Sequence, residues 1–99
     1  MSPTPDDLGP PASYLTLEEG AAVVSSDGER IGKVEEVVAD TQADVFDGLV
    51  IGRAPLGLDR RYVDADHVDR IHERGVVLSI TAAEAAALPE PRREAPGGR

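Results

Sequence analysis

The chain of 99 residues contains no cysteine and no tryptophan, and its aromatic residues are two tyrosines and one phenylalanine. Without cysteine, both disulfides and thiolate zinc sites are excluded. No apolar run is long enough to span a bilayer, and Met1 to Leu15 lack the basic and apolar regions of a secretory signal. We therefore expect a cytoplasmic protein that does not contact a membrane.

Basic residues are also scarce. Ten lysines and arginines stand against 19 aspartates and glutamates, which gives a net charge of −9. Residues 15–90 hold sixteen of the acids and seven of the bases, so the excess lies in the body of the chain. An acidic surface repels phosphate backbones, which argues against direct nucleic-acid binding. The candidates for a basic patch are Arg60, Arg61, Arg70 and Arg74, and solvated strand and turn positions explain them better.

Both ends of the chain are rich in proline. Residues 1–14 carry four prolines and few large apolar side chains, and residues 89–99 carry three prolines and a Gly97-Gly98 pair. Such segments bury too little surface to offset their conformational entropy. We expect disordered tails at 1–14 and 89–99 around one domain at 15–88, whose roughly 75 residues suffice for a small core but not for a deep catalytic pocket.

Between the tails the pattern is one of short strands separated by turn residues. Asp27-Gly28 and Arg74-Gly75 are typical of tight hairpins, Ala54–Asp59 is a predicted loop, and Ala65–Val68 a single 3₁₀-like turn. The pattern predicts an all-β fold, a small closed or partly open barrel of five to six short antiparallel strands. The strands are expected near Ala21–Ser25, Ile31–Asp40, Phe46–Gly52, Arg60–Asp64, Ile71–Glu73 and Val76–Ile80.

The run Ile31–Asp40 does not alternate strictly between apolar and polar residues. Ile31, Val34 and Val37 are spaced by three, which suits a helix as well as an irregular strand. Because β-branched residues and the preceding turn favour a strand, we expect a bulge or sharp bend near Gly32.

A short helix is predicted at the end of the domain. Thr81 can accept a hydrogen bond from the first turn while Glu84 reaches back to the Thr81 amide, which is the capping-box arrangement. Pro89 ends this helix.

The strand Phe46–Gly52 carries three consecutive apolar residues, so both of its faces must be covered. The second face lies either under the C-terminal segment or in a subunit interface. The second alternative predicts a homodimer whose contact surface uses Phe46, Leu49, Val50, Ile51 and Tyr62.

No residues form a recognisable catalytic, cofactor or metal motif. His67 and His72 have no third ligand at a fixed spacing, and Asp40, Asp44 and Asp47 lack the order of a calcium loop. We therefore assign no catalytic, cofactor-binding or metal residue and expect a protein that is not an enzyme.

The order of motifs resembles the PRC-barrel family over about residues 16–88. The resemblance rests on Ser26-Asp27-Gly28-Glu29, Ile31-Gly32-Lys33-Val34, Phe46-Asp47-Gly48-Leu49-Val50, Tyr62-Val63-Asp64-Ala65 and Val76-Val77-Leu78. It implies a non-catalytic module for protein interaction and self-assembly, as in small stand-alone bacterial members, with an unidentified protein partner. An alternative implied by the family is an accessory factor in ribosome maturation or RNA processing that acts by docking to a protein.

Overall fold

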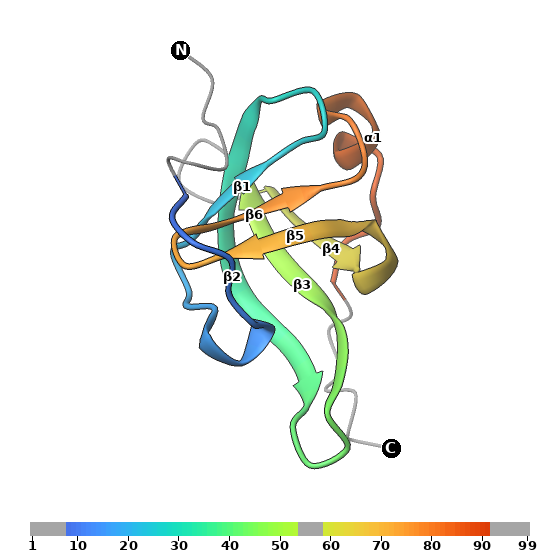
Figure 1. Ribbon diagram of the computed structural model, residues 1–99. Helices are drawn as coiled ribbons and strands as arrows, with labels where there is room; N and C mark the ends of the chain where they lie inside the picture. The colour runs from blue at the N-terminus through green and yellow to red at the C-terminus, as the bar shows by residue number, and fades with distance from the viewer. Residues whose placement is uncertain (1–7, 54–58, 92–99) are drawn as a thin grey trace.

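The computed structural model describes residues 8–53 and 59–91. They form one six-stranded sheet, two short 3₁₀ turns and one short helix, as Figure 1 shows. The predicted all-β barrel class with a short C-terminal helix is confirmed. In chain order the elements are η1 (Tyr14–Thr16), β1 (Ala22–Val24), β2 (Arg30–Asp40), β3 (Val45–Arg53), β4 (Asp59–Asp64), η2 (Ala65–His67), β5 (Val68–His72), β6 (Gly75–Leu78) and α1 (Ala82–Ala86).

The sheet has the strand order β4-β3-β2-β1-β6-β5 and curls into a half-barrel. Figure 1 shows β5 and β6 crossing in front of β2 and β3, so that the two ends of one sheet face each other around the core. The prediction of antiparallel strands holds for four of the five strand contacts. The exception is the pair β1 and β6, which run parallel.

The first hairpin is built as the sequence predicts. The Ser25 amide donates to the Glu29 carbonyl at 2.8 Å, and Gly28 has a φ of 84°, a conformation that a residue with a Cβ rarely adopts. The buried Ser25 hydroxyl accepts from the Glu29 amide and donates to the Asp27 carboxylate. This donor lowers the pKa of the Asp27 carboxyl.

β2 is a strand with two irregularities and not a helix. Its register against β1 shifts at Ile31, next to Gly32 as predicted, and its register against β3 shifts again at Glu35. The bulges explain the spacing of the apolar residues, because Ile31 and Val34 are three apart and yet both lie in the core.

The core lies inside the curl of the sheet. It contains side chains from five strands, from α1 and from the turn after η1, and it includes Leu17, Val23, Ile31, Val34, Leu49, Ile51, Val63, Val76, Leu78 and Ala85. Leu49, Val50 and Ile51 of β3 are 0%, 4% and 0% exposed. Both faces of β3 are therefore covered within one chain, and its burial does not require a subunit interface.

The ends of the described chain differ from the expected disordered tails. Leu8 is buried, and its carbonyl accepts from the Arg74 amide at 2.8 Å, while the Ala12 amide donates to the Ile71 carbonyl at 2.9 Å. Residues 8–12, which we call the strap, thus lie along the free edge of β5. The prediction considered only how little the segment can bury, whereas an open strand edge also supplies backbone hydrogen bonds.

The C-terminal segment covers the other edge of the sheet. The Tyr62 amide donates to the Pro89 carbonyl at 2.8 Å, and the Arg61 guanidinium donates to the Leu88 carbonyl at 2.7 Å. Pro89, the first residue of the predicted C-terminal tail, therefore lies beside β4. The rest of the two predicted tails, residues 1–7 and 92–99, and most of the predicted loop, residues 54–58, lie outside the described residues.

α1 begins at the predicted capping box. Thr81 Oγ1 accepts from the Glu84 amide at 3.1 Å, and Glu84 Oε1 accepts from the Thr81 amide at 2.8 Å. Ala85 packs into the core and fixes the helix against the end of the half-barrel. No helix within the described ranges is long and apolar enough to cross a membrane.

Candidate functional site

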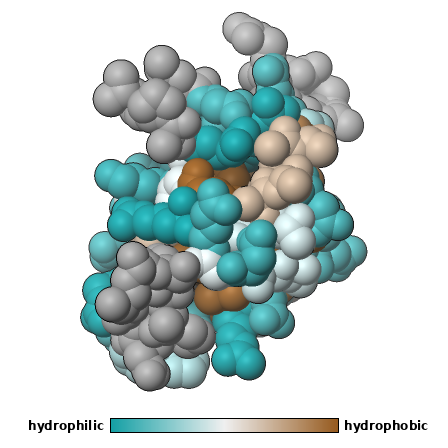
Figure 2. Space-filling view, turned by 90° about the horizontal axis from the view of Figure 1, so that it is seen from above, coloured by the Kyte–Doolittle hydropathy of each residue, from teal (hydrophilic) through white to brown (hydrophobic). Residues whose placement is uncertain are grey.

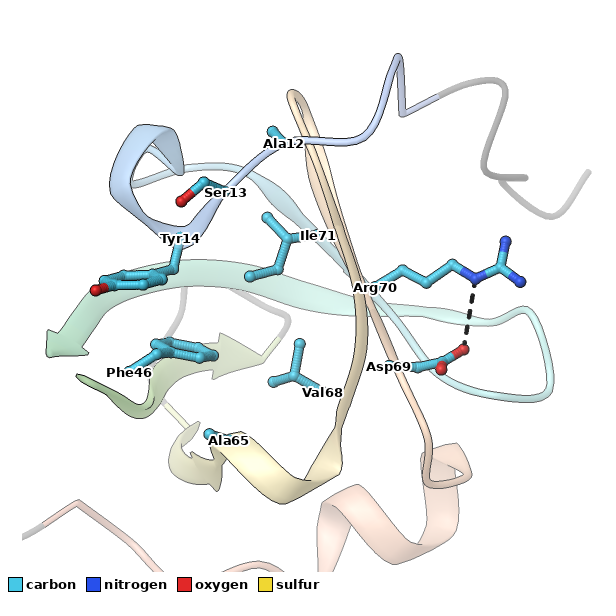
Figure 3. A pocket seen from close by; sticks show the side chains of 9 residues that line it. All are labelled: Ala12, Ser13, Tyr14, Phe46, Ala65, Val68, Asp69, Arg70 and Ile71. Atoms are coloured by element: carbon cyan, nitrogen blue, oxygen red, sulfur yellow. Dashed lines mark ion pairs between the residues drawn. The ribbon is translucent and has the colours of Figure 1, made fainter. Parts of the chain in front are cut away.

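A groove opens between the N-terminal end of the domain and β5. It has a volume of about 280 Å³ and is lined by residues of the strap, η1, β3, η2 and β5, namely Ala12, Ser13, Tyr14, Phe46, Ala65, Val68, Asp69, Arg70 and Ile71. Figure 3 shows the Tyr14 and Phe46 rings on one side, with Val68 and Ile71 pointing toward them from the other. We call this the Tyr14–Phe46 groove.

Tyr14 and Phe46 form one wall of the groove. Their rings stack with centroids 5.2 Å apart and planes 15° from parallel. The Tyr14 hydroxyl donates to Asp44 Oδ1 at 2.6 Å, which links η1 to the turn between β2 and β3. This hydrogen bond, with the nearby negative charges of Asp44 and Asp40, raises the pKa of Tyr14 to about 12.

The turn between β2 and β3 positions both groups. Asp40 Oδ1 accepts from the amides of Gln42 and Ala43 at 3.1 and 3.2 Å, and Asp44 has a φ of 56°. Aspartate tolerates this left-handed conformation better than most residues do.

A bulge then directs Phe46 to the groove. Against β2, Gly48 pairs with Val38 and Phe46 pairs with Ala39, so Asp47 is an extra residue. Because strand side chains alternate between faces, this insertion turns Phe46 to the same side as Leu49, against the core.

Two exposed apolar residues neighbour wall residues of the groove in the sequence, and a charged pair belongs to its lining. Leu15 is 60% exposed and follows Tyr14 in the sequence. Val45 is 45% exposed and precedes Phe46. Asp69 and Arg70 are the charged residues of the lining, and Arg70 Nε lies 3.8 Å from Asp69 Oδ2. Figure 3 shows both side chains directed away from the cavity. The apolar floor is therefore open to solvent within an acidic surrounding.

The five interface residues predicted from the sequence do not share one surface. Leu49 and Ile51 belong to the core, and Phe46 packs against it while lining the groove. Val50 and Tyr62 are cross-strand partners on the opposite face of the sheet. Leu49, Val50 and Ile51 are buried in a single chain and offer little side-chain surface to a partner, so the predicted interface stays a prediction.

Tyr62 is the half-exposed member of that opposite face. Its hydroxyl donates to the Asp47 carbonyl at 3.0 Å, and its ring lies over Gly48, where a Cβ would collide with it. Partial burial raises the pKa of Tyr62, and so do the charges of Asp64 and Asp47.

The histidines and acidic residues considered as ligands have structural positions. His72 is 5% exposed, and its Nδ1 lies 2.9 Å from the Gly9 carbonyl oxygen, so it donates to the strap. Asp40 caps a turn and Asp44 accepts from Tyr14. Within the described part of the chain, no three His, Cys, Asp or Glu side chains gather as a metal site requires.

The candidate basic patch is dispersed over carboxylate partners. Arg61 Nε lies 2.9 Å from Asp59 Oδ1. Arg60 Nε lies 3.6 Å from Glu35 Oε1. Arg70, on the other side of the half-barrel, pairs with Asp69.

Three groove residues were missed by sequence reasoning. Tyr14 falls within the predicted disordered tail, Val68 at the end of a predicted turn and Ile71 at the start of a predicted strand. Ser13 offers the missing signal, because its Oγ accepts from the Leu15 amide at 3.0 Å and caps η1. A capping residue directly before an aromatic residue indicates that the ordered domain begins before residue 15, which is its predicted start.

Comparison with known proteins identifies the family. No curated protein matches this chain. A family model described as PRC-barrel domain matches residues 13–84, from the cap of η1 to α1, and thus covers nearly all of the half-barrel. The chain belongs to the PRC-barrel domain family.

Proposed function

We propose that this PRC-barrel domain is a non-catalytic protein-interaction module that binds its partner at the Tyr14–Phe46 groove. The observation that carries the proposal is the groove itself, an open cavity with the apolar side chains of Tyr14, Phe46, Val68 and Ile71 in its lining. Apolar and aromatic side chains that line an open concave site are typical of protein contact surfaces.

Large apolar side chains are scarce among the exposed residues. Figure 2 shows a second face of the molecule, where hydrophilic side chains cover most of the area and the apolar residues form small separate patches. Among the described residues, Leu15 and Val45 are the large apolar side chains that are exposed, at 60% and 45%. Each is next in sequence to an aromatic wall residue of the groove, so a substitution there tests a contact at this end of the domain.

Self-association into a homodimer stays a prediction, with a smaller surface than the sequence suggested. Of the five candidates, Tyr62 is the one that remains accessible on the outer face of β3 and β4. Light scattering during size exclusion measures the mass directly. A dimer that Tyr62→Arg splits supports self-association through this face, and a monomer at high concentration contradicts it.

Affinity purification tests the interaction at the groove. The tagged protein is compared with the double variant Leu15→Asp, Val45→Asp and with the control Ala83→Asp, Ala87→Asp, which places the same two charges on exposed positions at α1. Proteins that co-purify with the parent and the control, but not with the double variant, support the proposal. Co-purification of the same proteins with all three contradicts it.

The same experiment separates the alternative role in ribosome maturation or RNA processing. An acidic domain can dock to a basic ribosomal protein even though it repels RNA. Ribosomal proteins recovered at low salt favour this alternative, and their absence removes it.

A further inference from the structure

The free part of β5 forms the second wall of the groove. β5 is the last strand of the sheet, and the strap pairs with it only from Ile71 to Arg74. After Ala12 the chain turns into η1, so within the described residues no strand lies beyond Val68, Asp69 and Arg70 on this edge. A partner therefore has direct access to this stretch.

The edge itself is poorly suited to adding another strand. The pairing of β5 with β6 shifts register between Val68 and Arg70, which makes Asp69 an extra residue. Bulges and charged side chains on an edge strand oppose the addition of a further strand. Recognition at this site must therefore depend on side chains.

The shape of the cavity suits the side chain of a protein partner. Its volume of about 280 Å³ is at the lower end of the range of roughly 300–1,000 Å³ that is common for small-molecule pockets, and the groove is open on one side. The stacked rings of Tyr14 and Phe46 face Val68 and Ile71 across it. An aliphatic side chain of a partner would contact apolar surface on both sides.

The charge around the groove determines whether an acidic or a basic partner is attracted. Asp40 and Asp44 lie close enough to act on the Tyr14 hydroxyl, and the exposed Asp66 follows Ala65 of the lining in η2. Arg70 is the cation of the lining, and it is paired with Asp69 and directed away. A second copy of this chain brings a net charge of −9 and is repelled, whereas a basic segment is attracted.

We propose that the Tyr14–Phe46 groove binds a basic segment of a partner protein that inserts one aliphatic side chain between the Tyr14–Phe46 stack and Val68–Ile71, with flanking lysines or arginines beside the aspartates of the rim. This inference rests on the proposed function, because it names the chemistry of the partner at the same site.

Amide NMR spectra of the full-length ¹⁵N-labelled protein test the inference with three short peptides of equal length. The first carries one leucine between lysines, the second has serine in place of leucine, and the third has glutamates in place of the lysines. The first peptide is expected to shift the amides of Tyr14, Phe46 and Val68–Ile71 in a saturable manner. Each replacement is expected to weaken binding about tenfold or more.

Salt and charge variants refine the test. Raising the salt from about 50 mM to about 300 mM is expected to weaken the first peptide several-fold, since rim charges are screened. Asp66→Asn in η2 is expected to weaken it, whereas Glu29→Gln in the β1–β2 turn leaves it unchanged.

Two results would overturn the inference. One is equal binding of the leucine and serine peptides, with shifts spread over the acidic surface. The other is the absence of shifts in the groove with the first peptide. If either occurs while partner capture still depends on Leu15 and Val45, the interaction module stands and the basic aliphatic segment is rejected. If capture is also independent of these residues, both proposals fail.

Discussion

At the scale of single residues, Tyr14 joins three parts of the molecule. Its hydroxyl donates to Asp44, its ring stacks on Phe46, and its backbone carbonyl ends η1 by accepting from the Leu17 amide at 3.3 Å. The phenol must stay protonated to donate to the carboxylate. The pKa of Tyr14 therefore rises from 10.0 to about 12, and the hydrogen bond to Asp44 is the main cause.

This pKa shift predicts the pH range in which the contact weakens. The pKa in the folded state lies above that in the unfolded chain, so the contribution of the contact to stability is complete below pH 10. It declines as the pH rises from 10 to about 12, where the phenol of the folded protein ionises.

Phenolate absorbance measures this directly, because the chain has no tryptophan and two tyrosines. In a Tyr62→Phe variant the remaining signal belongs to Tyr14 and is expected to have its midpoint near pH 12. Asp44→Asn keeps a residue that tolerates the positive φ but removes the charge, so the midpoint should fall toward 10. Circular dichroism at each pH confirms that the protein is folded. A midpoint near 10 in the Tyr62→Phe protein contradicts the assignment.

At the scale of elements, two glycines on neighbouring strands differ in how well they tolerate a larger side chain. A Cβ at Gly32 of β2 would collide with the backbone carbonyl of Gly52 on β3. A Cβ at Gly52 would instead meet the carboxyl end of the Glu35 side chain. Backbone in a paired strand does not yield easily, whereas Glu35 can rotate and loses only a half-exposed pair with Arg60 at 3.6 Å.

We therefore predict unequal effects of the same substitution. Gly32→Ala is expected to lower the free energy of unfolding by about 3 kcal/mol, as overpacking a rigid site does. Gly52→Ala is expected to change it by less than about 1 kcal/mol, because glycine in a strand interior is itself unfavourable. Denaturant unfolding followed by circular dichroism compares the two. Equal losses would show that Glu35 cannot move aside.

The features that sequence could predict are those decided locally. Asp27-Gly28 specifies its turn through a positive φ, and Thr81 with Glu84 specifies a helix start through two hydrogen bonds over three residues. The extra residues at Glu35 and Asp47 leave no such trace, because they are defined only by the partner strand. The sequence therefore indicates Phe46 as a candidate contact residue, but it does not predict which face of β3 carries the Phe46 ring or that this ring stacks on Tyr14.

At the scale of the whole molecule, the half-barrel remains open between β4 and β5, and the chain covers both edges with its terminal segments. Pro89 accepts a hydrogen bond from β4, and the strap accepts from Glu73 and Arg74 after β5. Uncovered edges favour aggregation, so these segments protect the sheet. The strap also contributes Ala12 to the lining of the groove. The segment that protects the edge of the sheet is therefore also part of the proposed binding site.

Leu8 fixes the strap, and its truncation should open this edge without unfolding the barrel. Leu8 is 4% exposed, and Leu8→Ala is expected to cost about 2 kcal/mol, which accelerates hydrogen exchange of the amides of Glu73 and Arg74 about thirtyfold. These amides donate to Pro10 and Leu8 of the strap at 3.1 and 2.8 Å. The Val34 amide, which donates to Ala21 in the barrel, should keep its rate, and the control Leu15→Ala should change none of them. If Leu8→Ala accelerates Val34 as much as Glu73 and Arg74, the strap unfolds only with the entire domain and is not a separate unit.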